Sequence, residues 1–374
     1  MKKLAIYGAG YIGKGLLKML EREGIPVDCF CVDEHGKVNK TDVESGKPVL
    51  LLEEIASESS RFYLPAVHEI FLPQIENSLK SFGIENYLLP PKHILQMIDE
   101  SSFLSRLEIT PIIGCKVNCR FCPQNVLIKK YRSVGKKNAV MALEDYKKCI
   151  DNLPKEVIVN FAGMAEPFLH PDAVEMIRYA HETGHPVELF TTLVGMTKEK
   201  FNRIRDIPFR RFALHVADRE GYAHIPVTRE YLELLSEITD VKKATGEPFV
   251  EFANCQSEPH PEVLKITEGK ISVTWNLIDR AGNLTDDKLP HVCHEGAIYC
   301  CRSLYLKHNV LIPDGSVLIC CMDYGMKHVV GNLLKETWEE IHDGDKIKEL
   351  KNQMSVGEID DILCKYCEAA ISLK

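Results

Sequence analysis

The chain has 374 residues, of which 45% are hydrophobic and 27% charged, with a formal net charge of −8. This length allows two or three domains with separate cores. The negative charge gives no footprint for nucleic acid, and no apolar run approaches the roughly 20 residues that cross a membrane. Glycines break up the first apolar stretch, so no secretion signal is indicated. Fourteen cysteines then favour metal ligation in a reducing cytoplasm over disulfides.

Residues 1–98 begin with the pattern of a dinucleotide-binding βαβ unit. An apolar strand at 4–7 leads into a loop with Gly8, Gly10 and Gly13, and an amphipathic helix follows. A second strand at 26–32 ends at Asp33, where an acid could bind a ribose hydroxyl. Such a loop binds phosphate at the helix N-terminus. The pattern therefore predicts a Rossmann-like accessory domain.

What this domain binds stays open between three interpretations. The glycine loop is compatible with NAD. The turn at 46–49 and the segment at 51–55 resemble the Rossmann-like domains of bacterial surface-glycan proteins, which implies a nucleotide-sugar. A domain that binds nothing and only packs is the third interpretation.

Residues 103–290 alternate between strand and helix signals, which is typical of parallel β/α architecture. Strands are expected at 107–110, 156–161, 187–191, 212–216, 249–252 and 272–276. Helices are expected at 142–152, 171–183, 197–205 and 228–244. Five or six such units favour a partial barrel over a complete eightfold one.

Three cysteines on one short loop carry the strongest signal in the chain. Cys115, Cys119 and Cys122 have the spacing C-x3-C-x2-C, directly after the expected strand at 107–110. Complete ligation of a cubane iron–sulfur cluster takes four thiolates, so three leave one iron open to a small molecule. A structural zinc site would need a fourth ligand nearby, and none follows before Cys149.

This loop resembles that of the radical S-adenosylmethionine (SAM) superfamily. The resemblance implies a partial (β/α)6 barrel whose [4Fe–4S] cluster chelates SAM through its open iron. An external one-electron reductant such as flavodoxin or ferredoxin would reduce the cluster. Cleavage of SAM would then give a 5′-deoxyadenosyl radical that abstracts hydrogen from a substrate carbon.

Further residues at the ends of the expected strands match the family. The segment 160–167 resembles the Gly-Gly-Glu-Pro segment that contacts SAM, with Ala165 at a usual glycine position, which Ala tolerates if φ stays negative. Polar residues at strand ends of such barrels carry the chemistry. The resulting candidates for cofactor contacts are Phe121, Gly163, Met164, Ala165, Glu166, Thr191, Thr192, His215 and Asp218.

The region 291–374 is rich in cysteine. Its pattern of Cys301, Gly315, Cys320 and the pair Cys364 and Cys367 resembles the SPASM/Twitch extension of radical SAM enzymes. The resemblance implies an auxiliary [4Fe–4S] cluster on those four cysteines, with the neighbours Cys300 and Cys321 as possible substitutes. A four-cysteine zinc site is the alternative, because the spacing fits both.

Together these features predict a radical SAM enzyme that acts on a small molecule. By analogy with Twitch-type dehydrogenases, and given the glycan-like N-terminal region, the expected reaction is oxidation or epimerisation of a sugar, cyclitol or nucleotide-sugar. Epimerisation would need a hydrogen donor, for which Cys255, just past the strand expected at 249–252, is the catalytic candidate. A peptide-modifying maturase and a non-catalytic iron–sulfur redox or nucleotide sensor are the alternatives.

Overall fold

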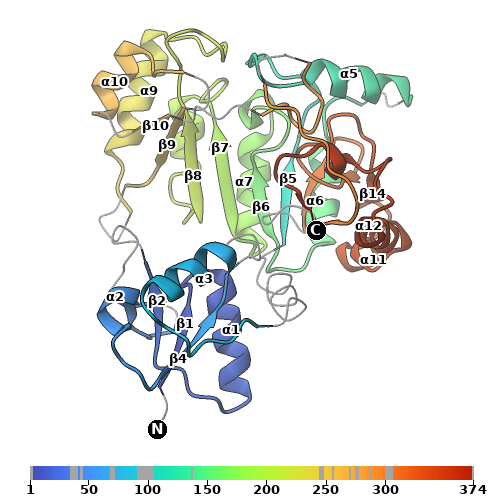
Figure 1. The fold of residues 1–374 in the computed structure, drawn as a ribbon. Coiled ribbons are helices and arrows are strands. Elements are labelled where there is room, and N and C mark those ends of the chain that lie inside the picture. The colour runs from blue at the N-terminus through green and yellow to red at the C-terminus, as the bar shows by residue number, and fades with distance from the viewer. Residues whose placement is uncertain are drawn as a thin grey trace. The chain divides into compact units, whose positions relative to one another are not determined.

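The computed structural model divides into two compact units, residues 1–103 and 104–374. It describes residues 3–33, 41–42, 45–67, 72–90, 105–135, 138–243, 248–254, 257–268, 271–273, 278–285, 289–299 and 306–372. Figure 1 shows the elements of both units. None of the described helices combines the length and apolar character that crossing a membrane requires.

The first unit contains a four-stranded parallel sheet in the order β3-β2-β1-β4. Its elements are β1 (Lys3–Tyr7), α1 (Tyr11–Arg22), β2 (Cys29–Val32), β3 (Val49–Leu51), α2 (Leu52–Ile55), β4 (Arg61–Pro65) and α3 (Leu72–Ser81). Side chains alternate across each strand, so β1 contributes to two cores. Ile6 packs with Leu16 and Leu17 of α1, whereas Ala5 packs on the other face with Leu79 of α3. The strand order is one that occurs in doubly wound nucleotide-binding folds.

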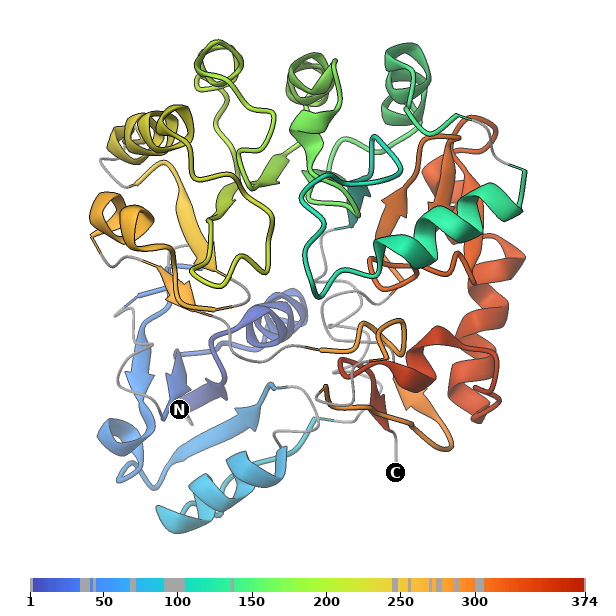
Figure 2. The same ribbon diagram turned by 90° about the horizontal axis from the view of Figure 1, so that it is seen from above.

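The second unit is built on a nine-stranded sheet. Six strands are parallel and follow one another in chain order: β5 (Arg106–Ile109), β6 (Ile158–Phe161), β7 (Val187–Thr191), β8 (Arg211–His215), β9 (Glu251–Asn254) and β10 (Ser272–Val273). The connecting helices, coloured green to orange in Figure 2, lie outside the curved row of strands. They are α5 (Gln124–Ser133), α6 (Leu143–Asp151), α7 (Ala173–Glu182), α8 (Lys198–Asn202), α9 (Arg229–Asp240) and α10 (Pro261–Thr267). This confirms the α/β fold with a six-stranded parallel row that the sequence predicts.

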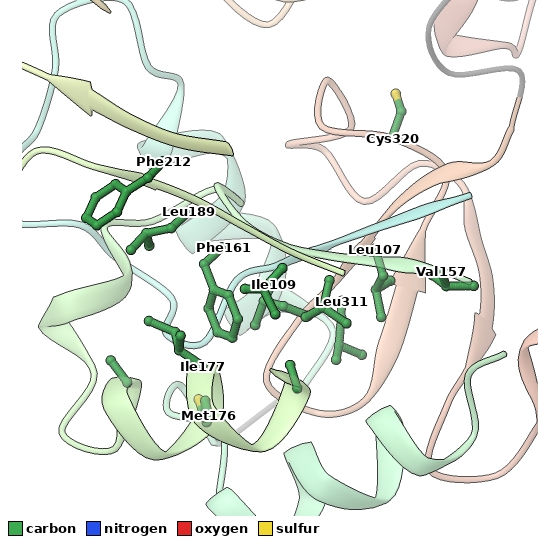
Figure 3. Close-up of a cluster of buried hydrophobic side chains, with 14 of the residues drawn as sticks. Leu107, Ile109, Val157, Phe161, Met176, Ile177, Leu189, Phe212, Leu311 and Cys320 are labelled. Carbon is green, nitrogen blue, oxygen red and sulfur yellow. The ribbon is translucent and has the colours of Figure 1, made fainter. Parts of the chain in front are cut away.

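The packing between helices and strands explains why these segments form the unit. In Figure 3, Met176 and Ile177 of α7 lie against Phe161 of β6 and Ile109 of β5. These side chains are all buried, and burying an aliphatic or aromatic side chain contributes roughly 1.5–3 kcal/mol. The residues of β5 to β8 are buried in near-continuous runs, as expected for parallel strands covered on both faces.

The C-terminal part of the chain extends the same sheet. Strand β12 (His308–Leu311) pairs with β5 in parallel, and β13 (Ser316–Leu318) and β14 (Val329–Asn332) continue it antiparallel. The rest of this C-terminal part consists of helices and one small separate sheet. The helices are α11 (Trp338–His342), α12 (Asp345–Val356) and the 3-10 turn Leu363–Tyr366, and the sheet pairs β11 (Ile298–Tyr299) with β15 (Ile371–Ser372). The division at residue 290 stays a prediction, because the part after it belongs to the same compact unit as the barrel.

The bounds of several elements differ from those expected. The helix expected at 228–244 ends at Asp240, because Val241 turns extended and Lys242 forms a bridge with Pro248. The strand expected at 249–252 runs from Glu251 to Asn254. Of the strand expected at 272–276, Ser272 and Val273 form β10, and residues 274–276 lie outside the described part of the chain. Helix α5 follows the cysteine loop directly and was not expected.

Candidate active site

The cysteine loop begins at the carboxyl end of β5 and holds three cysteines, none of them in a disulfide, around one cavity. Cys115, Cys119 and Cys122 all line this cavity. Two backbone turns shape the loop, from Asn118 N to Cys115 O at 3.3 Å and from Cys122 N to Cys119 O at 3.0 Å. Asn118 has a positive φ of 42°, a conformation that Asn adopts more readily than most residues. The loop therefore presents its sulfurs to a common space.

The loop after β8 fixes the outer side of the cysteine loop. Arg120 N donates to Tyr222 O at 2.8 Å, and His224 N donates to Val117 O at 2.9 Å. The ring of Phe121 meets that of Tyr222 edge to face, with centroids 5.8 Å apart. The Arg120 guanidinium lies over both rings. Phe121 thus packs beside the cysteines while it also lines the cavity.

Donor groups surround the sulfurs. The backbone N–H of Glu166 donates to Cys115 Sγ at 3.4 Å. The Tyr324 hydroxyl and Gln124 Nε2 each lie 3.5 Å from Cys122 Sγ. Burial raises the pKa of the Cys115 thiol, and backbone hydrogen bonds from Glu166 and Val117 oppose the rise. Hydrogen-bond donors at a sulfur stabilise its thiolate form, which is the form that binds metal.

The segment after β6 lies on the opposite side of the cavity, where Gly163, Met164, Ala165 and Glu166 line it. A Cβ on Gly163 would lie 2.3 Å from Ile109 O, so the close approach of this loop to β5 requires glycine. Met164 N donates to Thr110 Oγ1 at 2.8 Å. Ala165 does not have a positive φ, as expected for its tolerance at a usual glycine position.

The carboxylate of Glu166 ties the end of β6 to the end of β7. It accepts hydrogen bonds from Thr191 Oγ1 at 2.7 Å, from Thr192 N at 2.7 Å and from Thr192 Oγ1 at 2.6 Å. Phe168 N adds a fourth donor at 3.3 Å. Burial raises the pKa of Glu166, and the hydrogen bonds from Thr192 and Thr191 oppose the rise. The side chains of these three residues therefore brace the cavity wall from within.

His215 and Asp218 follow β8 and both line the cavity. The imidazole of His215 stacks on Phe190, with ring centroids 6.1 Å apart. Burial, with the charges of Arg211 and Arg280, lowers the pKa of His215 to about 4, so it is neutral at pH 7. Asp218 accepts from Tyr222 N at 2.9 Å, Ala223 N at 3.0 Å and Ser257 Oγ at 3.0 Å. Its carboxylate is thus largely engaged in holding its own loop.

The sequence reasoning missed several residues that line the cavity, among them the polar residues Gln124, Arg280 and Tyr324. The buried Gln124 carries an Oε1 atom that has no hydrogen-bond partner within the described part of the chain, while its Nε2 donates to Met164 O. Arg280 lies in a tight turn with φ of 57°, in which Leu284 N donates to Asp279 O at 2.9 Å. Arg280 and Tyr324 are far in sequence from most of the cavity residues, so spacing gave no signal for them. Gln124, two residues after the last cysteine, could have been noted.

The C-terminal cysteines lie partly within the described residues. Cys320, Cys364 and Cys367 are buried, and Cys321 is half-buried. Cys320 lies on the loop after β13 and belongs to the buried cluster drawn in Figure 3. Burial raises the pKa of Cys320 well above its usual value, and the nearby thiols of Cys321 and Cys364 add to the rise. Cys321, by contrast, packs in the apolar cluster that contains Tyr324 and Cys122.

Some predicted site residues fall outside the described part of the chain, namely Cys255, Cys300 and Cys301. Among the described residues, no three His, Cys, Asp or Glu side chains are grouped as for a single metal ion. The thiolates of an iron–sulfur cluster bind different irons, so they surround a larger group.

In the glycine loop of the first unit, close packing explains two of the three glycines. A Cβ on Gly13 would lie 1.9 Å from Gly8 O, and one on Gly8, where φ is 116°, would lie 2.8 Å from Ala66 O. A Cβ on Gly10 would meet nothing within 4 Å. The exposed Asp33 accepts from Ser78 Oγ at 3.3 Å. Gly8 and Gly13 therefore serve close packing of strand, loop and helix, and ligand binding at this loop stays a prediction.

The residues around this cavity suit an iron–sulfur cluster, which is the group that three cysteines on one loop imply. Cys115, Cys119 and Cys122 share a cavity, donors reach two of the sulfurs, and a glycine-lined wall faces them. Gln124 Oε1, an orphaned acceptor in the same cavity, could accept from an amino group of a bound ligand. A cluster with an open iron and a polar ligand such as SAM fits this donor set.

Two family models match the second unit. The radical SAM superfamily model matches residues 109–235, and the iron–sulfur cluster-binding SPASM domain matches residues 300–368. The chain therefore belongs to the radical SAM superfamily, in its SPASM/Twitch subgroup. These domains imply SAM binding, a SAM-binding [4Fe–4S] cluster and an auxiliary [4Fe–4S] cluster. No curated protein matches the sequence of the chain.

Several solved structures are similar to this chain. The crystal structure of BtrN in complex with AdoMet and 2-DOIA shares 16% identity, covers 72% of this chain and 94% of its own, and gives a TM-score of 0.47. SuiB of Streptococcus suis, bound to the precursor peptide SuiA, shares 15% identity over 80% of this chain and 83% of its own, with a TM-score of 0.48. The protein anSMEcpe with AdoMet and the Cp18Cys peptide shares 15% identity over 70% and 86%, with a TM-score of 0.43.

Proposed function

We propose that this radical SAM enzyme oxidises an alcohol carbon of a sugar, cyclitol or nucleotide-sugar to a ketone. Cys115, Cys119 and Cys122 would hold the SAM-binding cluster. Cys301, Cys320, Cys364 and Cys367 would hold the auxiliary cluster, and the burial of Cys320 near Cys364 supports its choice over Cys321. When bound, these groups supply an electron that cleaves SAM to a 5′-deoxyadenosyl radical and an acceptor for the electron that substrate oxidation releases.

The wall formed by residues 163–166 would position SAM beside the cysteines. The backbone of this segment is fixed by Thr110 and by the approach of Gly163 to Ile109. Glu166 keeps Thr191 and Thr192 at the same wall through its hydrogen bonds. Because the loops are held before a ligand binds, little reorganisation is needed when SAM enters.

His215 carries the proposal of oxidation, since its imidazole lines the same cavity as the three cysteines. Loss of a hydrogen atom from an alcohol carbon leaves a carbon radical that still bears its hydroxyl. Conversion to a ketone requires loss of the hydroxyl proton and of one electron. A neutral imidazole can accept that proton.

Arg280 favours a substrate that carries a negative group. It lines the cavity close enough to His215 to add to the burial that lowers the pKa of that imidazole, and close enough to Tyr324 to oppose the rise in pKa that burial causes there. Asn283 Nδ2 donates to Arg280 O at 2.7 Å and to Met322 O at 2.9 Å, and Glu368 Oε1 accepts from Asp279 N at 2.7 Å. These bonds fix the turn that carries Arg280. A fixed guanidinium is suited to phosphate or carboxylate, as in a nucleotide-sugar.

The test is anaerobic reconstitution with iron and sulfide, followed by assay with SAM, a strong reductant and a panel of carbon-deuterated sugars, cyclitols and nucleotide-sugars. We expect about eight irons in the wild type and about four in the Cys115/Cys119/Cys122→Ala variant. Only the wild type should form 5′-deoxyadenosine. Deuterium should pass from one substrate to 5′-deoxyadenosine, and the product should be a ketone.

Two variants separate oxidation from the other reactions. His215→Gln should still form 5′-deoxyadenosine but lose most of the ketone, and Cys255→Ala should remain active. An isomeric product that gains hydrogen from solvent, with activity lost in Cys255→Ala, would mean epimerisation instead. Turnover of peptides but of no sugar would reject this substrate class, and intact clusters without SAM cleavage would reject radical chemistry.

A further inference from the structure

Tyr324 connects the C-terminal part of the chain to the cysteine loop. It lies four residues after Cys320, and its hydroxyl is 3.5 Å from Cys122 Sγ. The side chain is buried and packs in one apolar cluster with Leu127 and Met164. Although nearly 200 residues separate them, Tyr324 and Cys122 therefore meet inside the second unit.

The loop that carries Tyr324 is held rigidly by its neighbour Asp323. The fully buried carboxylate of Asp323 accepts from Lys327 N at 2.6 Å and from His328 N at 2.8 Å. Asp323 N also donates to Cys320 O at 3.1 Å. These bonds close the loop on itself, so the position of the Tyr324 hydroxyl is linked to the position of Cys320.

The direction of the contact with Cys122 follows from metal binding. An iron-bound thiolate carries no proton, so its sulfur can only accept. The Tyr324 hydroxyl must then donate, and Gln124 Nε2, also at 3.5 Å, is a second donor to the same sulfur. Among the described residues the Tyr324 hydroxyl forms no other hydrogen bond, and the side chain is buried, with only 5% of its surface exposed.

We propose that Tyr324 is a positioning residue that raises the reduction potential of the SAM-binding cluster. Reduction adds a negative charge that spreads onto the thiolates, and a hydrogen bond to a ligand sulfur stabilises this more negative state. Because Tyr324 shares a closed loop with Cys320, the C-terminal part of the chain contributes directly to the potential at which SAM can be cleaved. The inference rests on cluster binding by Cys115, Cys119 and Cys122.

The experiment is a redox titration of reconstituted holoenzyme, followed by electron paramagnetic resonance of the reduced SAM-binding cluster. Tyr324→Phe removes only the hydroxyl. At a fixed solution potential we expect the ratio of reduced to oxidised cluster to fall about threefold to tenfold. For a one-electron couple, tenfold corresponds to about 59 mV. The iron content should stay equal to that of the wild type.

Tyr131→Phe is the matched control. Tyr131 is a buried tyrosine of the same apolar cluster, and its hydroxyl donates to Asn138 O at 2.7 Å. Its loss should leave the cluster potential unchanged. Equal shifts in both variants would mean that packing and not the hydrogen bond sets the potential, and no shift in Tyr324→Phe would also overturn the proposal.

A second replacement tests the opposite sign. Site-specific replacement of Tyr324 by 3-fluorotyrosine makes the phenol a stronger donor and should shift the potential upward. This variant decides the matter if Tyr324→Phe fails to fold, and an unchanged or lower potential would then contradict the proposal. If wild-type protein binds no cluster at the 115–122 loop, the proposed function itself fails, which the iron content shows separately.

Discussion

Two loops of this chain follow a strand of a parallel sheet and contain glycines that a side chain could not replace. One is residues 8–13 after β1, and the other is residues 162–166 after β6. In the first unit Lys14, which directly follows Gly13, pairs with Asp42 at 2.7 Å. In the second unit a free acceptor and three thiols remain directed at a cavity. A glycine pattern thus reports close backbone packing in both places, and only the polar groups around it indicate a ligand.

The largest expected effect comes from Glu166→Ala, which leaves the donors of Thr191, Thr192 and Phe168 without their acceptor. We expect the rate of SAM cleavage to fall by about 100-fold, because the cavity wall shifts. The free energy of unfolding should drop by about 3 kcal/mol, because buried donors are left unsatisfied. An assay of reductive SAM cleavage measures the rate, and thermal denaturation measures the change in stability.

The control for this change is Glu175→Ala. Glu175 lies on the surface of α7 and pairs with Arg203 at 2.7 Å. Its loss should cost less than about 1 kcal/mol and leave SAM cleavage unaltered. Normal cleavage by Glu166→Ala would show that the wall does not depend on this carboxylate.

An intermediate effect is expected from Gly13→Ala in the first unit. The added Cβ would lie 1.9 Å from Gly8 O, so α1 must move away from β1. We expect a loss of about 1–3 kcal/mol in the free energy of unfolding, as for other overpacked sites. Gly10→Ala, whose Cβ meets nothing, should be nearly neutral. Both should cleave SAM normally.

Denaturation of these two variants measures their stability, and titration with NAD and a nucleotide-sugar measures their ligand binding. Together the two measurements distinguish a packing role of the glycine loop from a binding role. If Gly10→Ala keeps its stability but weakens binding of either ligand, the glycine loop is a binding site. A stable Gly13→Ala protein would contradict the packing role assigned to that glycine.

The smallest effect concerns the ion pair of Lys14 and Asp42. Burial would raise the pKa of Asp42, but Lys14 and Ser45 outweigh it and hold the pKa at about 2. The folded-state pKa is below that of the unfolded chain, so this stabilisation is present above pH ~4 and is lost as the pH falls toward 2. Lys14→Met should reduce this pH dependence and cost under about 1 kcal/mol at pH 7. Urea denaturation between pH 2 and pH 7 measures the free energy of unfolding of the wild type and of Lys14→Met. Identical pH curves for these two proteins would assign the low pKa of Asp42 to Ser45 alone.

The sequence was most informative where chemistry is local. The spacing of Cys115, Cys119 and Cys122 and the segment ending at Glu166 identified the loop and the wall of the cavity. The parallel strands were predictable from their apolar runs, with ends displaced by a few residues. Local patterns also suggested Asp218 as a ligand contact, yet the structure shows its carboxylate occupied by three donors of its own surroundings.

Contacts between distant segments were not predictable. Tyr324 reaches Cys122 only because β12 and β13 extend the barrel sheet beside β5, and no spacing rule records that pairing. Arg280 reaches the cavity because the turn after residue 278 is clamped to Met322 and Glu368. Such residues become visible only when tertiary structure brings them to one cavity.

The pairing of β12 with β5 also constrains how the chain is made in the cell. His308 lies opposite Arg106, about 200 residues earlier, and the Nε2 of His308 is 2.6 Å from Glu108. One edge of β5 therefore stays unpaired until β12 has left the ribosome, and the synthesis of about 200 residues takes about 10–40 seconds at about 5–20 residues per second. During that time the edge is open to wrong partners. Iron would then best be delivered to the cysteine loop that follows β5 after synthesis ends. A truncated product would expose an aggregation-prone strand edge beside cysteines that hold no cluster.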